Sequence, residues 1–396
     1  MTTFGFQADA ARTLRAEPEF LDLPTYRRRG PAVLPCILLA LAAEFMDSTS
    51  ATTVDPVVDA SGAVQVKELT LPYSSVASSE GRREFITRAA MVAKAGTTTF
   101  DLNNMRQGVN ALAAAYVQDM SARFPVRLES SRLGGINVEV FTPSSGISAR
   151  NRSRILINIH GGGFVAGAHS MSQAESLPIA AVGRYKVISV DYRMGPESKF
   201  PAASEDVGAV YKELLKTYKP EDIGIYGCSA GGIITGEMIA WLASKGLPLP
   251  GAIGIFSAST GPFSVGDSHH LAPILTGTAA MVEEGGFGMF GLYFGAADPK
   301  DPLVYPANSA ALLARFPPTL LISGTRAEEM SSVIKSHVDL VKAGVDARLF
   351  VWEGMMHGFI INPKLPESNE AYQIITKFFD DQLGHHHARK RKGLHG

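Results

Sequence analysis

The chain has 396 residues and a formal net charge of −1, a balance that gives no indication of nucleic-acid binding or of a generally basic surface. Hydrophobic residues make up 45% of the chain and charged residues 19%, so it can bury a substantial core and is not disordered overall. Its two cysteines, Cys36 and Cys228, do not suffice for a disulfide framework or a cysteine zinc site. The chemistry must therefore come from other residues.

The first segment has features of a secretory signal. Basic residues at Arg27–Arg29 precede a short apolar run from Pro31 to Ala43, and small residues follow it. The run is too short to span a bilayer comfortably, so no stable membrane span is expected. A long stretch ahead of the arginines weakens this interpretation, and a buried apolar helix is the alternative. We expect residues 1–52 to be a signal or leader segment, with export to the periplasm slightly favoured over a cytoplasmic location.

The remaining chain changes its pattern near residue 130. Residues 53–125 place apolar positions at helical spacing, for example in "REFITRAAMVAKA". Beyond them, short β-branched apolar runs alternate with helical stretches, which predicts an α/β fold with a mostly parallel central sheet and helices on both faces. Residues 262–310 are rich in glycine and proline and are expected to form an insertion over the carboxyl edge of the sheet. Residues 385–396 are expected to be a basic, disordered tail. The predicted strands are residues 136–143, 154–160, 186–193, 223–228, 252–259, 319–324 and 347–354.

A G-x-S-x-G sequence lies where a predicted strand meets a predicted helix. In "YGCSAGG", the apolar run before Gly227 is typical of a strand and the residues after Gly231 are typical of a helix. A sharp turn there strains the backbone at Ser229 and pushes its Oγ out of the sheet. The Oγ then lies over a helix N-terminus, which stabilises developing negative charge. The alternative is an ordinary glycine-rich turn, so the motif alone does not decide the chemistry.

The glycines of "HGGGF" follow another predicted strand. Glycine lets backbone N–H groups approach a ligand oxygen because no Cβ stands in the way. We expect the N–H groups of Gly161 and Gly162, together with that of Ala230, to form a three-donor oxyanion hole. His160 is expected to orient this loop rather than to act as a base.

A serine hydroxyl needs a base to remove its proton, and His357 is the best-placed candidate. It follows the predicted strand "ARLFVW" and comes late in the chain, after Ser229. Most other histidines lie in the insertion, on a predicted helix or in the tail. Although a lone histidine is usually structural, this one has the position in the chain order that the chemistry requires.

Together these stretches resemble the hormone-sensitive-lipase-like group of α/β-hydrolases, the bacterial carboxylesterases. The matching pieces are "HGGGF", "DYRMGPESKFPAA", "YGCSAGG", "DPKDPLVYP", "LLISGT" and "WEGMMHGF", in that order. The resemblance implies an α/β-hydrolase fold, with a helical N-terminal cap at residues 53–125 and a catalytic domain at residues 126–384. It implies hydrolysis of short-chain carboxylic esters through an acyl-enzyme, with no cofactor and no metal. It also implies that Ser229 is the nucleophile and His357 the base.

The chain departs from the pattern of this group at two positions. The residue before the serine is often Asp in the group and is Cys228 here, which we interpret as a packing residue under the turn. Three residues after the glycine of "LLISGT", where the group has its catalytic Asp, the chain has Ala327. Two glutamates follow, and a Glu can reach from a neighbouring position because it is one methylene longer. We favour Glu328 as the acid that orients the histidine, with Glu329 second and a missing acid as the third interpretation.

Two other functions remain open. A relative that binds a small molecule without hydrolysis, as the plant gibberellin receptor does, is favoured by the missing Asp. It is disfavoured because Ser229, His357 and the glycine loop are all present. An amidase or deacetylase would use the same residues, and the sequence does not separate it from an esterase. The expected partner is a small-molecule ester, and an edge strand near residues 345–352 could pair two copies in a homodimer.

Overall fold

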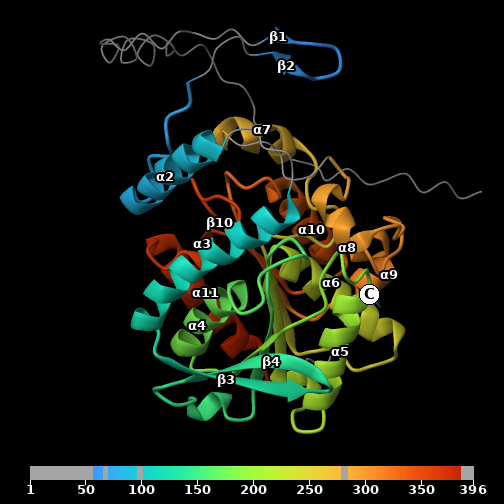
Figure 1. The fold of residues 1–396 in the computed structure, drawn as a ribbon. Coiled ribbons are helices and arrows are strands. Elements are labelled where there is room, and N and C mark those ends of the chain that lie inside the picture. Colours follow the sequence, from blue (N-terminus) through green and yellow to red (C-terminus); the bar gives the residue numbers. More distant parts are fainter. Residues whose placement is uncertain (1–56, 66–69, 96–100, 278–283, 385–396) are drawn as a thin grey trace, which may run out of the picture. The chain divides into compact units, whose positions relative to one another are not determined.

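The structure is a computed structural model, and it describes four stretches of the chain: residues 57–65, 70–95, 101–277 and 284–384 (Figure 1). The expected leader and the expected basic tail lie outside these residues, so both stay predictions. The chain divides into two compact units, Met1–Thr70 and Leu71–Gly396. The described part of the first unit is an antiparallel ribbon of β1 (Val57–Val58) and β2 (Val64–Gln65).

An eight-stranded sheet forms the centre of the second unit, with the strand order β10-β9-β8-β7-β5-β6-β4-β3. Strands β5 to β10 pair in parallel, whereas β4 pairs antiparallel with β6 and β3 pairs antiparallel with β4. The predicted mostly parallel sheet is confirmed, and β10 lies at one edge of it, as expected. The strands are β3 (Val126–Leu133), β4 (Ile136–Pro143), β5 (Ile155–Ile159), β6 (Val187–Val190), β7 (Ile223–Cys228), β8 (Ala252–Phe256), β9 (Thr319–Gly324) and β10 (Ala347–Trp352).

Helices cover both faces of this sheet (Figure 1). Helices α4 (Met171–Gly183) and α11 (Pro366–Gln382) pack on one face, while α5 (Ala202–Leu214), α6 (Ala230–Ser244) and α10 (Met330–Lys342) pack on the other. Each face has its own buried apolar cluster, because the strands of a parallel sheet bury side chains on both sides. The prediction of helices on both faces is therefore confirmed.

Two helices precede the sheet in the second unit, within the region predicted as a cap. They are α2 (Ser79–Ala95) and α3 (Leu102–Arg123), and the side chain of Asp101 caps α3 by accepting the N–H of Asn104 at 2.7 Å. Arg106 of α3 donates from Nε to the carbonyl oxygen of Val165 at 2.8 Å and from Nη2 to that of Gly195 at 2.9 Å. Helix α3 is thus attached to the loop that follows the glycines of "HGGGF".

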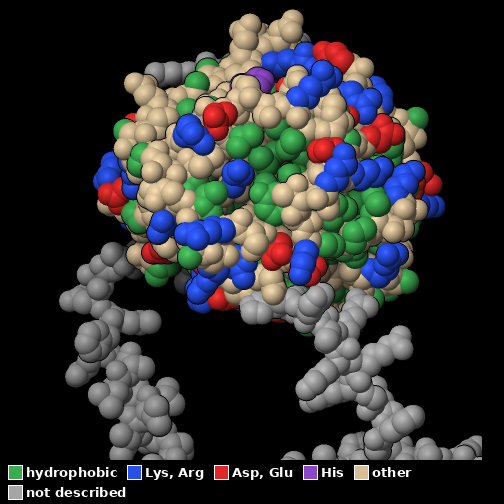
Figure 2. Space-filling model, turned by 90° about the horizontal axis from the view of Figure 1, so that it is seen from below, with side chains coloured by type: hydrophobic (Ala, Val, Ile, Leu, Met, Phe, Trp, Pro, Cys, Tyr) green, Lys and Arg blue, Asp and Glu red, His purple; other side chains and the backbone are tan. Residues whose placement is uncertain are grey.

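The glycine-rich insertion contains short helices rather than strands among its described residues. They are α7 (Asp267–Thr276) and α8 (Gly291–Phe294), and α9 (Ala310–Leu313) begins at its end. None of the helices in the described ranges combines the length and the apolar character that crossing a membrane requires. On the face drawn in Figure 2, Lys and Arg side chains are interspersed with Asp and Glu, in keeping with the net charge near zero.

Candidate active site

The turn between β7 and α6 holds Ser229 in an unusual backbone conformation. Its φ is 57° and its ψ is −124°, in a region that residues with a side chain rarely occupy. The turn is held by the N–H of Ser229, which donates to the carbonyl oxygen of Phe256 at 2.9 Å. A Cβ on Gly227 would lie 2.4 Å from the carbonyl oxygen of Ile159, and one on Gly231 would lie 1.8 Å from the same oxygen. Both flanking residues must therefore be glycine, and the sequence motif follows from this close packing.

Substitution of Gly231 by Ala is expected to lower the free energy of unfolding by more than about 3 kcal/mol, because the new methyl group overlaps backbone that has no room to move. The matched control is Gly236→Ala in the same helix, where the nearest atom would lie 3.8 Å from the new Cβ. This control should be neutral or stabilising by up to about 1 kcal/mol, since Ala favours a helix over Gly. Urea unfolding of both variants measures the difference, and equal midpoints would contradict this account of the turn.

His357 lies between Ser229 and an acidic side chain. It is in the turn that follows β10, and its Nε2 is 3.0 Å from Oγ of Ser229. Its Nδ1 is 3.0 Å from Oε2 of Glu329. A carboxylate at Nδ1 favours the tautomer that carries its proton there, which leaves Nε2 free to accept a proton from the serine.

Glu329 is fully buried at the start of α10, just after β9. Its Oε1 accepts a hydrogen bond from Oγ of Ser323 at 3.1 Å, while its Oε2 faces the imidazole. Burial opposes the negative charge, but the nearby His357 and its hydrogen bond outweigh burial, so the pKa of Glu329 lies below its ordinary value. The carboxylate is therefore charged at neutral pH.

The prediction of Glu328 as the partner of the histidine needs correction. Glu329 makes the hydrogen bond to His357, and Oε1 of Glu328 lies 3.8 Å from Nδ1 of His269 on α7 instead. Consecutive residues at a helix start point their side chains in different directions, so only one of the two glutamates can face the imidazole. A glutamate of this pair does face the imidazole, but it is Glu329, the residue that the sequence analysis ranked second.

The glycine loop after β5 brings several backbone N–H groups to the serine. Among the described residues, the N–H groups of Gly162, Gly163 and Ala230 have no hydrogen-bond acceptor. The N–H of Gly161, however, donates to Oε1 of Glu175 at 2.8 Å. The prediction of Gly161 as an oxyanion donor is therefore corrected, since this group is already engaged. The N–H of Gly163, which was not among the donors expected from the sequence, has no acceptor among the described residues.

His160 contacts the same loop, which it was expected to orient. Its ring stacks on Tyr192 with centroids 4.4 Å apart, and its Nδ1 lies 2.8 Å from the carbonyl oxygen of Gly161. The side chain is fully buried, and burial lowers the pKa of His160 to about 4, so the ring is neutral. A neutral ring packed on an aromatic neighbour fits an orienting role.

Cys228 is a packing residue in the structure. It is buried, and burial raises the pKa of its thiol well above the ordinary value, so it is not a thiolate at neutral pH. A nucleophilic role for this cysteine is therefore not supported by its surroundings.

A cavity of about 170 Å³ opens beside Ser229 and His357. Helix α3 contributes Met105, Val109 and Leu112 to its wall, and Met289 comes from the insertion. The wall is mainly apolar, and its polar side chains are those of Ser229, His357, Glu175 and Arg88. Such a cavity suits a small ester whose acyl group is apolar.

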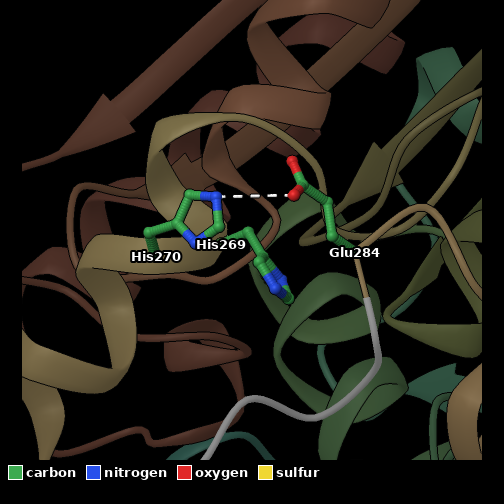
Figure 3. A group of neighbouring side chains, drawn as sticks. All are labelled: His269, His270 and Glu284. Atoms are coloured by element: carbon green, nitrogen blue, oxygen red, sulfur yellow. Dashed lines mark ion pairs between the residues drawn. The ribbon is translucent and has the colours of Figure 1, made fainter. Parts of the chain in front are cut away.

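A second group of polar side chains lies on the insertion, at His269, His270 and Glu284 (Figure 3). Nε2 of His270 is 3.4 Å from Oε2 of Glu284, and Nδ1 of His269 is 2.9 Å from Oγ of Ser264. Two of the three side chains are exposed, and these contacts account for the group without an ion. We therefore assign no function to it.

The chain is similar to known hydrolases and esterases, both in sequence and in structure. Residues 156–361, slightly more than half of the chain, match the family described as alpha/beta hydrolase fold. The chain is 29% identical to an acetyl-hydrolase of Streptomyces hygroscopicus over 241 residues, which cover 60% of this chain and 78% of that protein. Among solved structures, esterase E25 has a TM-score of 0.68 and 29% identity, covering 81% of this chain and 98% of its own. An esterase of the bacterial hormone-sensitive lipase family has a TM-score of 0.66 and 26% identity, covering 78% and 99%.

The fold and the polar residues at the serine define a hydrolase with an activated serine. The chain belongs to the α/β-hydrolase fold family. Within that family it is a hormone-sensitive-lipase-like carboxylic ester hydrolase, so the family, fold and enzyme class predicted from the sequence are confirmed.

Proposed function

We propose that the protein hydrolyses small carboxylic esters through an acyl-enzyme on Ser229, with His357 as the base and Glu329 as the acid. The observation that carries this proposal is the continuous hydrogen-bonded chain from Glu329 through His357 to Ser229, with 3.0 Å at each step. It ends beside a cavity in which backbone N–H groups have no acceptor within the described residues. Ester cleavage needs a nucleophile, a base and donors for an oxyanion, and this arrangement supplies all three.

In the proposed reaction, Nε2 of His357 takes the proton of Ser229 while Oγ attacks the ester carbonyl carbon. The carbonyl oxygen becomes an oxyanion and accepts hydrogen bonds from the N–H groups of Gly162, Gly163 and Ala230. Each hydrogen bond stabilises the transition state by roughly 3 kcal/mol. Glu329 holds the imidazole and stabilises its positive charge. His357 then protonates the departing alcohol, and a water molecule activated by the same ring releases the acid.

We infer that α2, α3 and the insertion act as the cap that shapes the cavity over this site. Three side chains of α3 and Met289 of the insertion support this role by lining the cavity. The attachment of Arg106 to the carbonyl oxygen of Val165 supports it as well, since it fixes α3 to the oxyanion loop. Residues 126–384 then remain the proposed catalytic domain, and pairing through β10 remains a prediction.

Short acyl chains are expected to be preferred, because a cavity of about 170 Å³ is smaller than the 300–1,000 Å³ typical of sites for drug-sized ligands. The ratio kcat/KM for nitrophenyl acetate should exceed that for nitrophenyl decanoate by about tenfold or more, since extra methylenes cannot be buried. Met289→Ala should lower the ratio of the two kcat/KM values, because the shorter side chain enlarges the cavity. Met91→Ala, at an exposed position of α2, should leave this ratio unchanged. A preference for decanoate in the wild type would contradict the proposal.

Amide hydrolysis and binding without catalysis are the competing functions. The complete hydrogen-bonded chain at Ser229 disfavours a protein that only binds, because binding needs no base on the serine. Steady-state rates on an ester and an amide with the same acyl group separate an esterase from an amidase. The proposal predicts turnover of the ester at least about tenfold faster than that of the amide. Faster turnover of the amide would favour the alternative.

A further inference from the structure

Behind the oxyanion loop lies a buried carboxyl group that the proposed mechanism does not use. Glu175 belongs to α4, is 6% exposed, and lines the same cavity as Ser229 and His357. Carboxyl groups are rarely so buried unless they are paired. No Lys or Arg forms an ion pair with Glu175 among the described residues. A buried, unpaired acid next to reacting groups is a candidate for a functional role.

The side chain of Glu175 is hydrogen-bonded to the oxyanion loop, to the strand that precedes it, and to the backbone of Cys228 beside the serine. Oε1 accepts the N–H of Gly161 at 2.8 Å, and Oε2 accepts from Nδ2 of Asn158 on β5 at 3.0 Å. A Cβ on Gly161 would lie 3.2 Å from this Oε1 and 3.4 Å from Cβ of Ser229. Gly161 is therefore held between the carboxyl group and the serine turn. Because the next two residues carry the free N–H groups, the position of Gly161 determines where those donors point.

The hydrogen bonds of Glu175 can be satisfied when the carboxyl group is uncharged. Asn158 Oδ1 accepts from Oγ of Ser189 at 2.7 Å. If the oxygen and nitrogen of the Asn158 amide exchange places, a protonated Glu175 donates to Asn158 and Asn158 donates to Ser189. The carbonyl oxygen of the neutral carboxyl group still accepts the N–H of Gly161. The hydrogen bonds among Glu175, Asn158 and Ser189 can therefore form whether the carboxyl group is charged or uncharged.

The groups around Glu175 give a negative charge little compensation. Tyr192, Tyr226 of β7 and Cys228 are the titratable groups that interact with it, and each is neutral in its ordinary form. Arg88 and His357 line the cavity as well, without pairing with it in the structure. Burial raises the pKa of Glu175 to about 8, although the hydrogen bonds from Asn158, from Gly161 and from the backbone of Cys228 act in the opposite direction.

We propose that Glu175 is the positioning residue of the oxyanion loop, and that it fixes Gly161 as an uncharged hydrogen-bond acceptor. A neutral acceptor holds the N–H groups of Gly162 and Gly163 toward the substrate oxygen without placing a negative charge beside the oxyanion. Ionisation of Glu175 puts two like charges close together beside a mainly apolar cavity, which disfavours the transition state. This inference rests on the proposed esterase function and adds a residue to it.

The test compares Glu175→Gln and Glu175→Ala with the wild type on nitrophenyl acetate, with Ser229→Ala as the blank. Gln keeps a neutral oxygen acceptor, so kcat near pH 7 should stay within about threefold of the wild type. Ala leaves the N–H of Gly161 unpaired and the loop unsupported, so kcat should fall by about tenfold or more with little change in KM. A Gln variant as slow as the Ala variant would overturn the proposal.

The pH profile separates positioning from simple structural support. The carboxyl group is neutral below its pKa, so kcat of the wild type should fall relative to that of Glu175→Gln by about tenfold between pH 7 and pH 9. Glu237→Gln is the matched control, because Glu237 is another buried carboxyl group but does not line the cavity. Its profile should follow the wild type. Parallel profiles for the wild type and Glu175→Gln would overturn the proposal even if Glu175→Ala fails to fold.

Thermal unfolding gives a readout that needs no activity. A buried carboxyl group with a raised pKa stays protonated while the unfolded chain ionises, so the wild type loses stability relative to Glu175→Gln as pH rises from about 4 to about 8. A constant difference in Tm over this range would contradict an uncharged Glu175.

If the wild type hydrolyses the ester no faster than Ser229→Ala, the proposed function fails. If it hydrolyses the ester but the pH profiles are parallel, only the role of Glu175 fails.

Discussion

Ser229→Ala is expected to lower kcat for nitrophenyl acetate by about 10⁴- to 10⁶-fold at neutral pH. The substitution removes the only oxygen within hydrogen-bond distance of Nε2 of His357 among the described residues, so no acyl-enzyme can form at this position. The oxyanion donors and the cavity remain, so KM should change little. Initial rates corrected for spontaneous hydrolysis measure this effect.

The control for Ser229→Ala is Ser257→Ala, a nearby buried serine whose Oγ accepts the N–H of Gly358 at 3.1 Å. It should keep most of the activity, because its hydroxyl does not touch the imidazole nitrogens. Retention of even one tenth of the wild-type rate by Ser229→Ala would mean that another nucleophile carries the reaction.

Glu329→Gln is expected to lower kcat by about 10⁴-fold. The amide of Gln can present an N–H to Nδ1 of His357, which favours the tautomer with its proton on Nε2. That nitrogen then cannot accept the proton of Ser229. The variant also removes the charge that stabilises the imidazolium, and the loss should appear in kcat rather than KM.

Glu328→Gln is the matched control, because it makes the same chemical change at the adjacent residue. Its side chain lies near His269 rather than His357, so kcat should stay within about threefold of the wild type. A large loss in Glu328→Gln with little loss in Glu329→Gln would restore the acid favoured from the sequence. Equal activity in all three proteins would mean that no carboxylate assists the histidine.

Most of the fold could be predicted from the sequence because parallel strands buried on both faces leave a clear apolar signal. Strands β5, β7 and β8 are buried at every position. Strand β3 was missed because most of its side chains are exposed and polar, so it lacks that signal. Its pairing with β4 depends on the turn at Gly134 and Gly135, both with positive φ.

The site was predicted in its residue types but only partly in its geometry. The serine turn follows from steric limits that only glycine meets, so the motif alone indicates it. The choice between Glu328 and Glu329 depends on the direction of side chains at the start of α10, which a sequence without an aspartate at the usual position does not reveal. The hydrogen bond of the Gly161 N–H depends on Glu175, a residue of α4 that lies outside the recognised motifs.

The central claim is that Ser229 carries the acyl group during ester hydrolysis. The most direct measurement is mass spectrometry of the protein quenched with acid shortly after mixing with nitrophenyl acetate. The account predicts an acetylated wild-type enzyme, with the acetyl group on the peptide that contains Ser229, and no acetyl group on that peptide in Ser229→Ala. Turnover of the ester with no acyl group on this peptide at any time would contradict the account.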